Sequence, residues 1–206
     1  MQLTFSQFQK PVDLPDAVGQ LAQQNHTEMM DAGELQYLAG ALAICPKAGA
    51  EIVCEIGAYV GQTTVYIAKC LQLMGRQMPI LSIDPFDRVT PDPGNPQGSY
   101  TRYLANIRDS GLDHVCLPLV AFSQDAAPVV PANIGVLIVD GSHHYPNVKQ
   151  DLELYLPKVV SGGIIFVDDY IPAYAGVMRA IDETFTPESP FSILHKTYFV
   201  IAQRRR

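Results

Sequence analysis

The sequence predicts an α/β fold, in which helices cover both faces of a doubly wound, mostly parallel sheet. Helices are expected at the N-terminus and an antiparallel hairpin at the C-terminus. Short apolar runs alternate with stretches of helical periodicity, which is typical of parallel strands joined by crossover helices. The runs at residues 136–139 and 164–167 are apolar almost throughout, as strands buried on both faces are.

Length and composition limit the class of protein. The 206 residues contain neither a repeat nor a linker, which suits a single domain over residues 1–206. Acidic residues outnumber basic ones by 21 to 14, and this balance argues against a nucleic-acid partner. The four cysteines form no C-x-x-C pair, which is typical of a reducing compartment. We see no signal sequence and no apolar run of the roughly 20 residues that a membrane span needs, so we expect a cytoplasmic protein.

Residues 1–48 are predicted to be a helical lead-in to the core. The first ten residues have no regular pattern, and residues 14–42 have a helical one with a break near Asn25. Leu35, Leu38 and Leu42 recur at helical spacing and form an apolar stripe. Such a stripe exceeds what one domain covers, so we expect a homodimer.

Residues 49–206 are predicted to form the α/β core. Strands are expected at residues 51–56, 79–83, 114–119, 136–139 and 164–167, with a terminal hairpin at residues 191–194 and 198–202. Helices are expected at residues 63–74, 99–108, 123–129, 147–156 and 175–185. Residues 86–97 are rich in Pro, Gly and Asp and predict a long loop, a kind of segment that often binds ligands.

The first predicted strand ends in a loop with the spacing Glu-x-Gly-x-x-x-Gly. Gly57 and Gly61 allow the backbone to turn sharply and approach a ligand closely. The carboxylate of Glu55 suits a cationic group, and the fingerprint of dinucleotide-binding proteins is absent. Thr63 either caps the next helix or offers its hydroxyl to a ligand carboxylate. An ordinary turn between strand and helix is the alternative interpretation.

The next two strands also end in polar residues. Asp84 ends the second strand and suits the hydroxyls of a ribose, although it also suits a turn before Pro85. Ser123 and Gln124 follow the third strand, where Ser123 serves equally well as a helix N-cap. Ligands of open parallel sheets bind outside the carboxyl ends of the strands, so these residues should converge on one site.

Three carboxylates follow the last two parallel strands. Asp140 ends the fourth strand, and Asp168 and Asp169 end the fifth. Like charges so close together repel, which predicts a hard divalent cation such as Mg²⁺, Ca²⁺ or Mn²⁺ among them. Capping of loops is the alternative. His143 and His144 follow Asp140, and a histidine beside a bound hydroxyl can take its proton.

In their order, these motifs resemble the class I S-adenosylmethionine (SAM)-dependent methyltransferases over residues 30–202. Residues 55–61 and 123–125 are most similar to the catechol-type O-methyltransferases. By this resemblance, the residues that would hold SAM are Glu55, Gly57, Gly61 and Thr63 at its methionine part, Asp84 at its ribose, Ser123 and Gln124 at its adenine, and Tyr59 and Asp140 as further contacts.

The resemblance also implies a metal and a base. In the catechol-type enzymes a divalent metal lies on an aspartate after strand four and on an Asp-Asp or Asp-Asn pair after strand five. This implies Asp140, Asp168 and Asp169 as ligands, with Mg²⁺ expected. Those enzymes carry a lysine three residues past the first ligand. Here His143 stands at that position, which is more similar to the bacterial macrolide-sugar O-methyltransferases.

The resemblance therefore implies metal-assisted methylation of a hydroxyl on a small molecule, such as a sugar or a phenol, with His143 as the base. Residues 91–100 would supply part of the acceptor pocket, with Tyr100 and Tyr103 either as its walls or as core. A metal-dependent hydrolase on the same fold and a non-catalytic cofactor-binding protein are the alternatives. The loop at residues 55–61, called the glycine loop below, disfavours the hydrolase. The intact acidic residues with His143 disfavour the non-catalytic protein.

Overall fold

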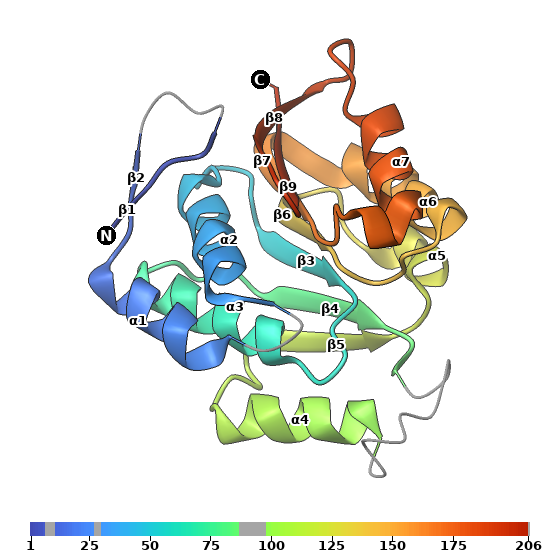
Figure 1. The fold of residues 1–206 in the computed structure, drawn as a ribbon. Helices are drawn as coiled ribbons and strands as arrows, with labels where there is room; N and C mark the ends of the chain where they lie inside the picture. The colour runs from blue at the N-terminus through green and yellow to red at the C-terminus, as the bar shows by residue number, and fades with distance from the viewer. Residues whose placement is uncertain (7–10, 27–29, 87–97, 206) are drawn as a thin grey trace.

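A computed structural model describes residues 1–6, 11–26, 30–86 and 98–205 of the chain (Figure 1). Its centre is a seven-stranded sheet with the order β5-β4-β3-β6-β7-β9-β8. These strands are β3 (Ile52–Ile56), β4 (Ile80–Asp84), β5 (Cys116–Val120), β6 (Ile134–Val139), β7 (Val159–Val167), β8 (Phe191–Lys196) and β9 (Val200–Arg204). The five strands from β3 to β7 run parallel, and β9 pairs antiparallel with both β7 and β8. The predicted doubly wound sheet with a terminal hairpin is confirmed.

Strand order reverses at the middle of the sheet. From β3 the chain moves outward through β4 to β5, and then returns to place β6 on the other side of β3. The loops after β3 and β6 therefore diverge to opposite faces, and sheets of this kind bind their ligands at that point. All six residues of β6 are buried, as expected for a strand between two layers of helices.

Helices cover both faces of the sheet (Figure 1). One face carries α1 (Asp16–Asn25), α2 (Ala32–Ile44), α3 (Gln62–Leu73) and α4 (Ser99–Asp109). The other face carries α5 (Ser123–Ala126), α6 (Tyr145–Tyr155) and α7 (Ala175–Thr184), and short 3₁₀ turns lie at η2 (Ala127–Val129), η3 (Leu156–Lys158) and η4 (Pro172–Tyr174). Two apolar cores result, one on each side of the sheet.

The N-terminal segment differs from the prediction in two ways. A two-stranded antiparallel sheet, β1 (Gln2–Leu3) with β2 (Val12–Asp13), occupies what had no predicted structure. Leu35, Leu38 and Leu42 are buried inside the domain, at most 2% exposed, so they supply no surface for a second copy. The stripe that predicted a homodimer belongs to the core of this chain, because α2 packs against α1 and α3 as well as the sheet.

Two further outcomes concern β7 and the long loop. The strand begins at Val159, five residues before the predicted start, because a Ser-Gly-Gly stretch interrupts the apolar run that signals it. Of the predicted loop at residues 86–97, only Phe86 is described, and residues 87–97 lie outside the described residues. Among the helices that the structure describes, none is long and apolar enough to cross a membrane.

Candidate functional site

The loops after β3 and β6 touch at the point where strand order reverses. Gly57 has φ +87°, and a Cβ atom there would lie 2.0 Å from the carbonyl oxygen of Asp140. The amide N–H of Asp140 donates to the carbonyl of Ile56, 2.8 Å away, which holds the two loops together. Glycine is therefore required at this position by the approach of two backbone segments, whatever ligand binds.

Gly61 and Thr63 form the entry into α3. Gly61, with φ +79°, is the N-cap of α3, and a Cβ on it would lie 2.7 Å from the ring of Tyr103. No side chain caps the helix, so the capping interpretation of Thr63 is wrong. Thr63 lies half-buried in the first turn, at the positive end of the helix, where an anionic group is favoured. Tyr103 is fully buried and belongs to the core rather than to a pocket wall.

Glu55 lies beneath this loop as a fully buried carboxyl group. Its Oε2 accepts hydrogen bonds from the hydroxyls of Thr64, at 2.6 Å, and Ser82, at 2.7 Å. Its Oε1 is buried and has no hydrogen-bond partner in the part of the chain that the structure describes. Burial raises the pKa of Glu55 to about 7. An unsatisfied acceptor under the glycine loop fits a cationic cofactor, and a direct contact stays a prediction.

Asp84 fastens the glycine loop to the end of β4. Its Oδ2 accepts from the amides of Ala58 and Tyr59, each at 2.8 Å, and its Oδ1 from the amide of Phe86 at 2.5 Å. The turn expected before Pro85 is thus present. Tyr59 has φ +47° and is 38% exposed. Contact of Asp84 with a ribose stays a prediction.

Ser123 is tied to α6 rather than to its own helix. The N-cap of α5 is Phe122 and makes no side-chain bond, so the capping interpretation of Ser123 is also wrong. The hydroxyl of Ser123 donates to Asp151, and the hydroxyl of Tyr155 donates to the carbonyl of Ser123. Burial raises the pKa of Asp151 to about 6. Gln124 is exposed at the open end of the sheet, where its predicted contact with adenine stays a prediction.

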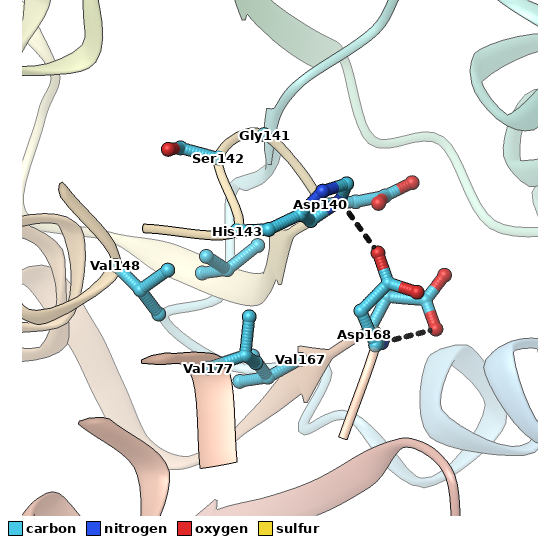
Figure 2. A pocket seen from close by; sticks show the side chains of 10 residues that line it. Asp140, Gly141, Ser142, His143, Val148, Val167, Asp168 and Val177 are labelled. Atoms are coloured by element: carbon cyan, nitrogen blue, oxygen red, sulfur yellow. Dashed lines mark hydrogen bonds and ion pairs between the residues drawn. The ribbon is translucent and has the colours of Figure 1, made fainter. Parts of the chain in front are cut away.

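Asp140 and Asp168 border a narrow pocket together with His143 (Figure 2). Figure 2 shows the two carboxylates and the imidazole at one end of it, and Val148, Val167 and Val177 at the other. Asp168 is 4% exposed, and burial together with the charge of Asp140 raises its pKa to about 9. Burial, and then the charge of Asp169, raise the pKa of Asp140.

Glu34 brings a fourth carboxyl group to this site, which sequence reasoning missed. It lies on α2, is 6% exposed, and its Oε2 accepts from the amide of Asp31 in a capping box at the start of the helix. Its charge contributes to the raised pKa of Asp168, and burial raises its own pKa. The capping box accounts for the sequence pattern locally, so no signal pointed to the sheet edge.

The residues predicted as metal ligands lie together at the ends of β6 and β7. Burial, and after it the charges of neighbouring carboxylates, raise the pKa of Asp140 and Asp168. Their donor atoms suit a hard cation, which would relieve the repulsion among these charges. Within residues 1–6, 11–26, 30–86 and 98–205, no three Asp, Glu, His or Cys side chains are already arranged to hold a metal ion. The donor chemistry thus fits the predicted metal, and its binding stays a prediction.

His143 pairs with Asp169. The distance from Nε2 of His143 to Oδ2 of Asp169 is 2.7 Å, and the two side chains are 41% and 29% exposed. The ring of Tyr174 stacks on the imidazole, with centroids 3.9 Å apart and planes 21° apart. His144 is the N-cap of α6 and does not line the pocket. The structure thus favours His143 over His144 as the residue that faces the site.

The strand order and the ligand edge at its reversal define a class I methyltransferase fold. Residues 54–170, more than half of the chain, match the family described as methyltransferase domain. The chain belongs to this family, and it is a SAM-dependent methyltransferase.

Solved structures share the fold at low sequence identity. The chain is similar to the O-methyltransferase NovP (TM-score 0.71, 20% identity, covering 91% of this chain and 88% of that one). It is similar to the O-methyltransferase TomG of Streptomyces achromogenes, solved with SAM (TM-score 0.61, 16% identity, covering 95% of this chain and 92% of that one). The O-methyltransferase of Bacillus cereus, solved with S-adenosylhomocysteine (SAH), is similar too (TM-score 0.62, 15% identity, covering 94% of this chain and 93% of that one).

One curated relative matches a shorter stretch. An uncharacterized protein of Acanthamoeba polyphaga mimivirus is 37% identical over 70 residues, which is 32% of this chain. The match spans 30% of the length of the viral protein.

Proposed function

We propose that the protein transfers the methyl group of SAM to a hydroxyl oxygen of a small molecule, with His143 as the general base. The observation that carries this proposal is the pairing of His143 with Asp169 at the edge where cofactors of this fold bind. The O-methyltransferases named in the similar structures support oxygen as the methyl acceptor. The net charge of −7 supports a small molecule over a nucleic acid.

The proposed reaction needs one proton transfer at the enzyme. SAM supplies an electrophilic methyl group on a sulfonium. His143 takes the proton of the acceptor hydroxyl, and the oxygen forms a bond to the methyl carbon as the carbon–sulfur bond breaks. The products are the methyl ether and SAH, and the partly exposed His143 passes its proton to solvent. Alignment and electrostatics supply most of the rate, since no covalent enzyme intermediate forms.

The glycine loop is shaped for the cofactor before it binds. Asp84 holds the amides of Ala58 and Tyr59, and the tight contact at Gly57 fixes the loop against the backbone after β6. A loop that is already ordered loses little further conformational entropy on binding. We assign this loop to the methionine part of SAM, with the exposed Gln124 beyond β5 near the adenine.

We also propose a divalent metal at this site. Asp140, Asp168 and Asp169 would hold it, and Mg²⁺ fits an all-oxygen donor set. The metal would lower the pKa of the acceptor hydroxyl. What supports this is the gathering of carboxyl groups, among them the buried Asp168, whose charges disfavour one another. The acceptor loop expected at residues 91–100 lies mostly outside the described residues.

Two measurements test the proposed function. Calorimetry with SAH should show binding in the micromolar range, about −8 kcal/mol. A screen of sugar and phenol acceptors with labelled SAM should then give methyl transfer to oxygen, and a chelator should abolish the transfer while SAH still binds. Turnover without SAM would instead favour a hydrolase. Absence of SAH binding at millimolar concentration would refute the assignment, and full transfer in excess chelator would refute the metal.

A further inference from the structure

We infer that Asp169 and Tyr174 are positioning residues that hold His143 as its Nε2–H tautomer, so that Nδ1 is the nitrogen that takes the acceptor proton. The inference rests on the proposed function, because it assigns roles around the proposed base. Both positioning residues lie on the single connection from β7 to α7, while His143 lies on the loop after β6. The base is therefore oriented by a neighbouring strand end rather than by its own loop.

Asp169 decides which imidazole nitrogen carries the hydrogen. A carboxylate only accepts hydrogen bonds, so Nε2 of a neutral His143, 2.7 Å from Oδ2, must be the protonated nitrogen. Nδ1 then keeps its lone pair. Because Asp169 uses Oδ2 for His143, its Oδ1 is left for other partners.

The backbone of Asp169 is unusual in a way that serves this contact. Asp169 has φ +60°, in the left-handed region that residues other than glycine adopt uncommonly. Its amide donates to Oδ1 of Asp168 at 2.8 Å, and its carbonyl accepts from the amide of Ile171 at 2.8 Å. Such a conformation persists only where surrounding bonds enforce it, and it is found preferentially at functional sites. Here it brings the side chain of Asp169 to His143.

Tyr174 limits the rotation of the imidazole. Its ring lies 3.9 Å from that of His143, nearly parallel, so it covers one face of a side chain that is 41% exposed. A half-exposed side chain on a loop would otherwise sample several rotamers. Tyr174 itself is held in the η4 turn, where its amide donates to the carbonyl of Ile171 at 2.9 Å. Carboxylate and ring together fix both the tilt of the imidazole and the nitrogen that it presents.

Gly176 brings the same connection against the backbone of the base. A Cβ at Gly176 would lie 2.6 Å from the amide nitrogen of Tyr145 and 2.8 Å from the carbonyl oxygen of His143. The start of α7 therefore packs directly on residues 143–145, which a larger residue would prevent. Main chain and side chain of His143 are thus both placed by the segment from Asp169 to Gly176.

Nuclear magnetic resonance of the histidine rings tests this inference without any acceptor. The chain contains five histidines, and His143 can be assigned by its loss in a His143→Gln variant. In ¹⁵N-histidine protein with chelator, at a pH where the ring is neutral, we expect Nδ1 of His143 unprotonated and Nε2 protonated. Asp169→Ala should convert this single form into a mixture of tautomers. A wild-type ring protonated at Nδ1, or an unchanged spectrum in Asp169→Ala, would overturn the inference.

The stacking is tested separately by the ring-current shift of the His143 carbon-bound protons. Tyr174→Phe should keep the upfield shift, and Tyr174→Leu, which fills similar space without a ring, should lose it. Tyr170→Ala is the matched control, because Tyr170 lies on the same connection but its hydroxyl bonds Asp182 and its ring faces Lys196. An unchanged shift in Tyr174→Leu would overturn the role of Tyr174.

Activity adds a readout that a merely structural role would not move. With an acceptor from the screen, Tyr174→Leu should lower kcat by about tenfold while the KM for SAM stays within twofold, and Tyr174→Phe should restore kcat. An equal fall of kcat in both variants, or a rise of the KM for SAM with kcat unchanged, would contradict a positioning role of Tyr174. Failure of the proposed function is distinguishable, because it would show as absent SAH binding while the tautomer and the stacking are still observed.

Discussion

Replacement of Glu55 by glutamine should change how the stability of the protein depends on pH. Glu55 is fully buried, and burial raises its pKa from an ordinary value of 4.5 to about 7. Between these two values the native protein holds a proton that the unfolded chain has released. The free energy of unfolding should therefore fall as pH rises from about 5 to about 7, and stay level above that range as far as Glu55 is concerned.

The structure sets the size of this effect. A pKa that moves from 4.5 to about 7 corresponds, at about 1.4 kcal/mol for each pKa unit, to a cost of about 3 kcal/mol at pH 8. Glutamine carries no such cost. Its carbonyl can still accept from Thr64 and Ser82, and its amide replaces the oxygen Oε1 that lacks a partner among the described residues. The gain from Glu55→Gln should be small at pH 5 and approach about 3 kcal/mol at pH 8.

Urea unfolding at several pH values between 5 and 8, without cofactor, measures this difference. Glu188→Gln is the matched control, since Glu188 is exposed. A plot of its free energy of unfolding against pH should run parallel to that of the wild type. If Glu55→Gln also ran parallel to the wild type, the buried carboxyl would already be ionised in the native state. The reasoning from burial would then be refuted.

Three further predictions concern the loops and the base. Gly57→Ala should lower the free energy of unfolding by roughly 3 kcal/mol or more, measured as a lowered Tm, because its Cβ would lie 2.0 Å from backbone. The control Gly49→Ala, with φ +76° and open space around it, should cost about 1–2 kcal/mol. His143→Gln should slow methyl transfer by about 10²–10⁴-fold while calorimetry shows unchanged SAH affinity, and an unaffected rate would exclude it as the base. Asp84→Asn should weaken SAH binding about tenfold by loosening the glycine loop, and the exposed Asp125→Asn should not.

The sequence was sufficient for the fold because the pattern that carries it is local. Alternating apolar runs and helical stretches predicted the five parallel strands and the terminal hairpin, and the structure has them within a few residues except at the start of β7. The same pattern placed Asp140, Asp168 and Asp169 at strand ends. Strand ends of a parallel sheet share one edge, so their proximity followed from sequence position alone.

Side-chain partners could not be predicted in this way, because they depend on packing between segments far apart in the chain. The carboxylate of Asp84 bonds amides 25 and 26 residues away, and Ser123 bonds Asp151, 28 residues away. For each residue the sequence also allowed a local role, a turn for Asp84 and a helix N-cap for Ser123. In the structure each side chain forms hydrogen bonds to a distant segment. The apolar stripe of α2 was ambiguous for the same reason, since periodicity shows that a helix has an apolar face but not what covers it.

The candidate base shows where this division falls. The sequence by itself determined that a histidine follows the acidic end of β6, which is enough to make His143 a candidate. Only the tertiary structure decided that Asp169 and Tyr174, from the next strand end, contact its ring, and that Glu34 from α2 adds a fourth carboxyl group beside Asp168. The sequence gives the chemical type of a residue. Its orientation and its pKa depend on neighbouring residues that only folding brings into contact with it.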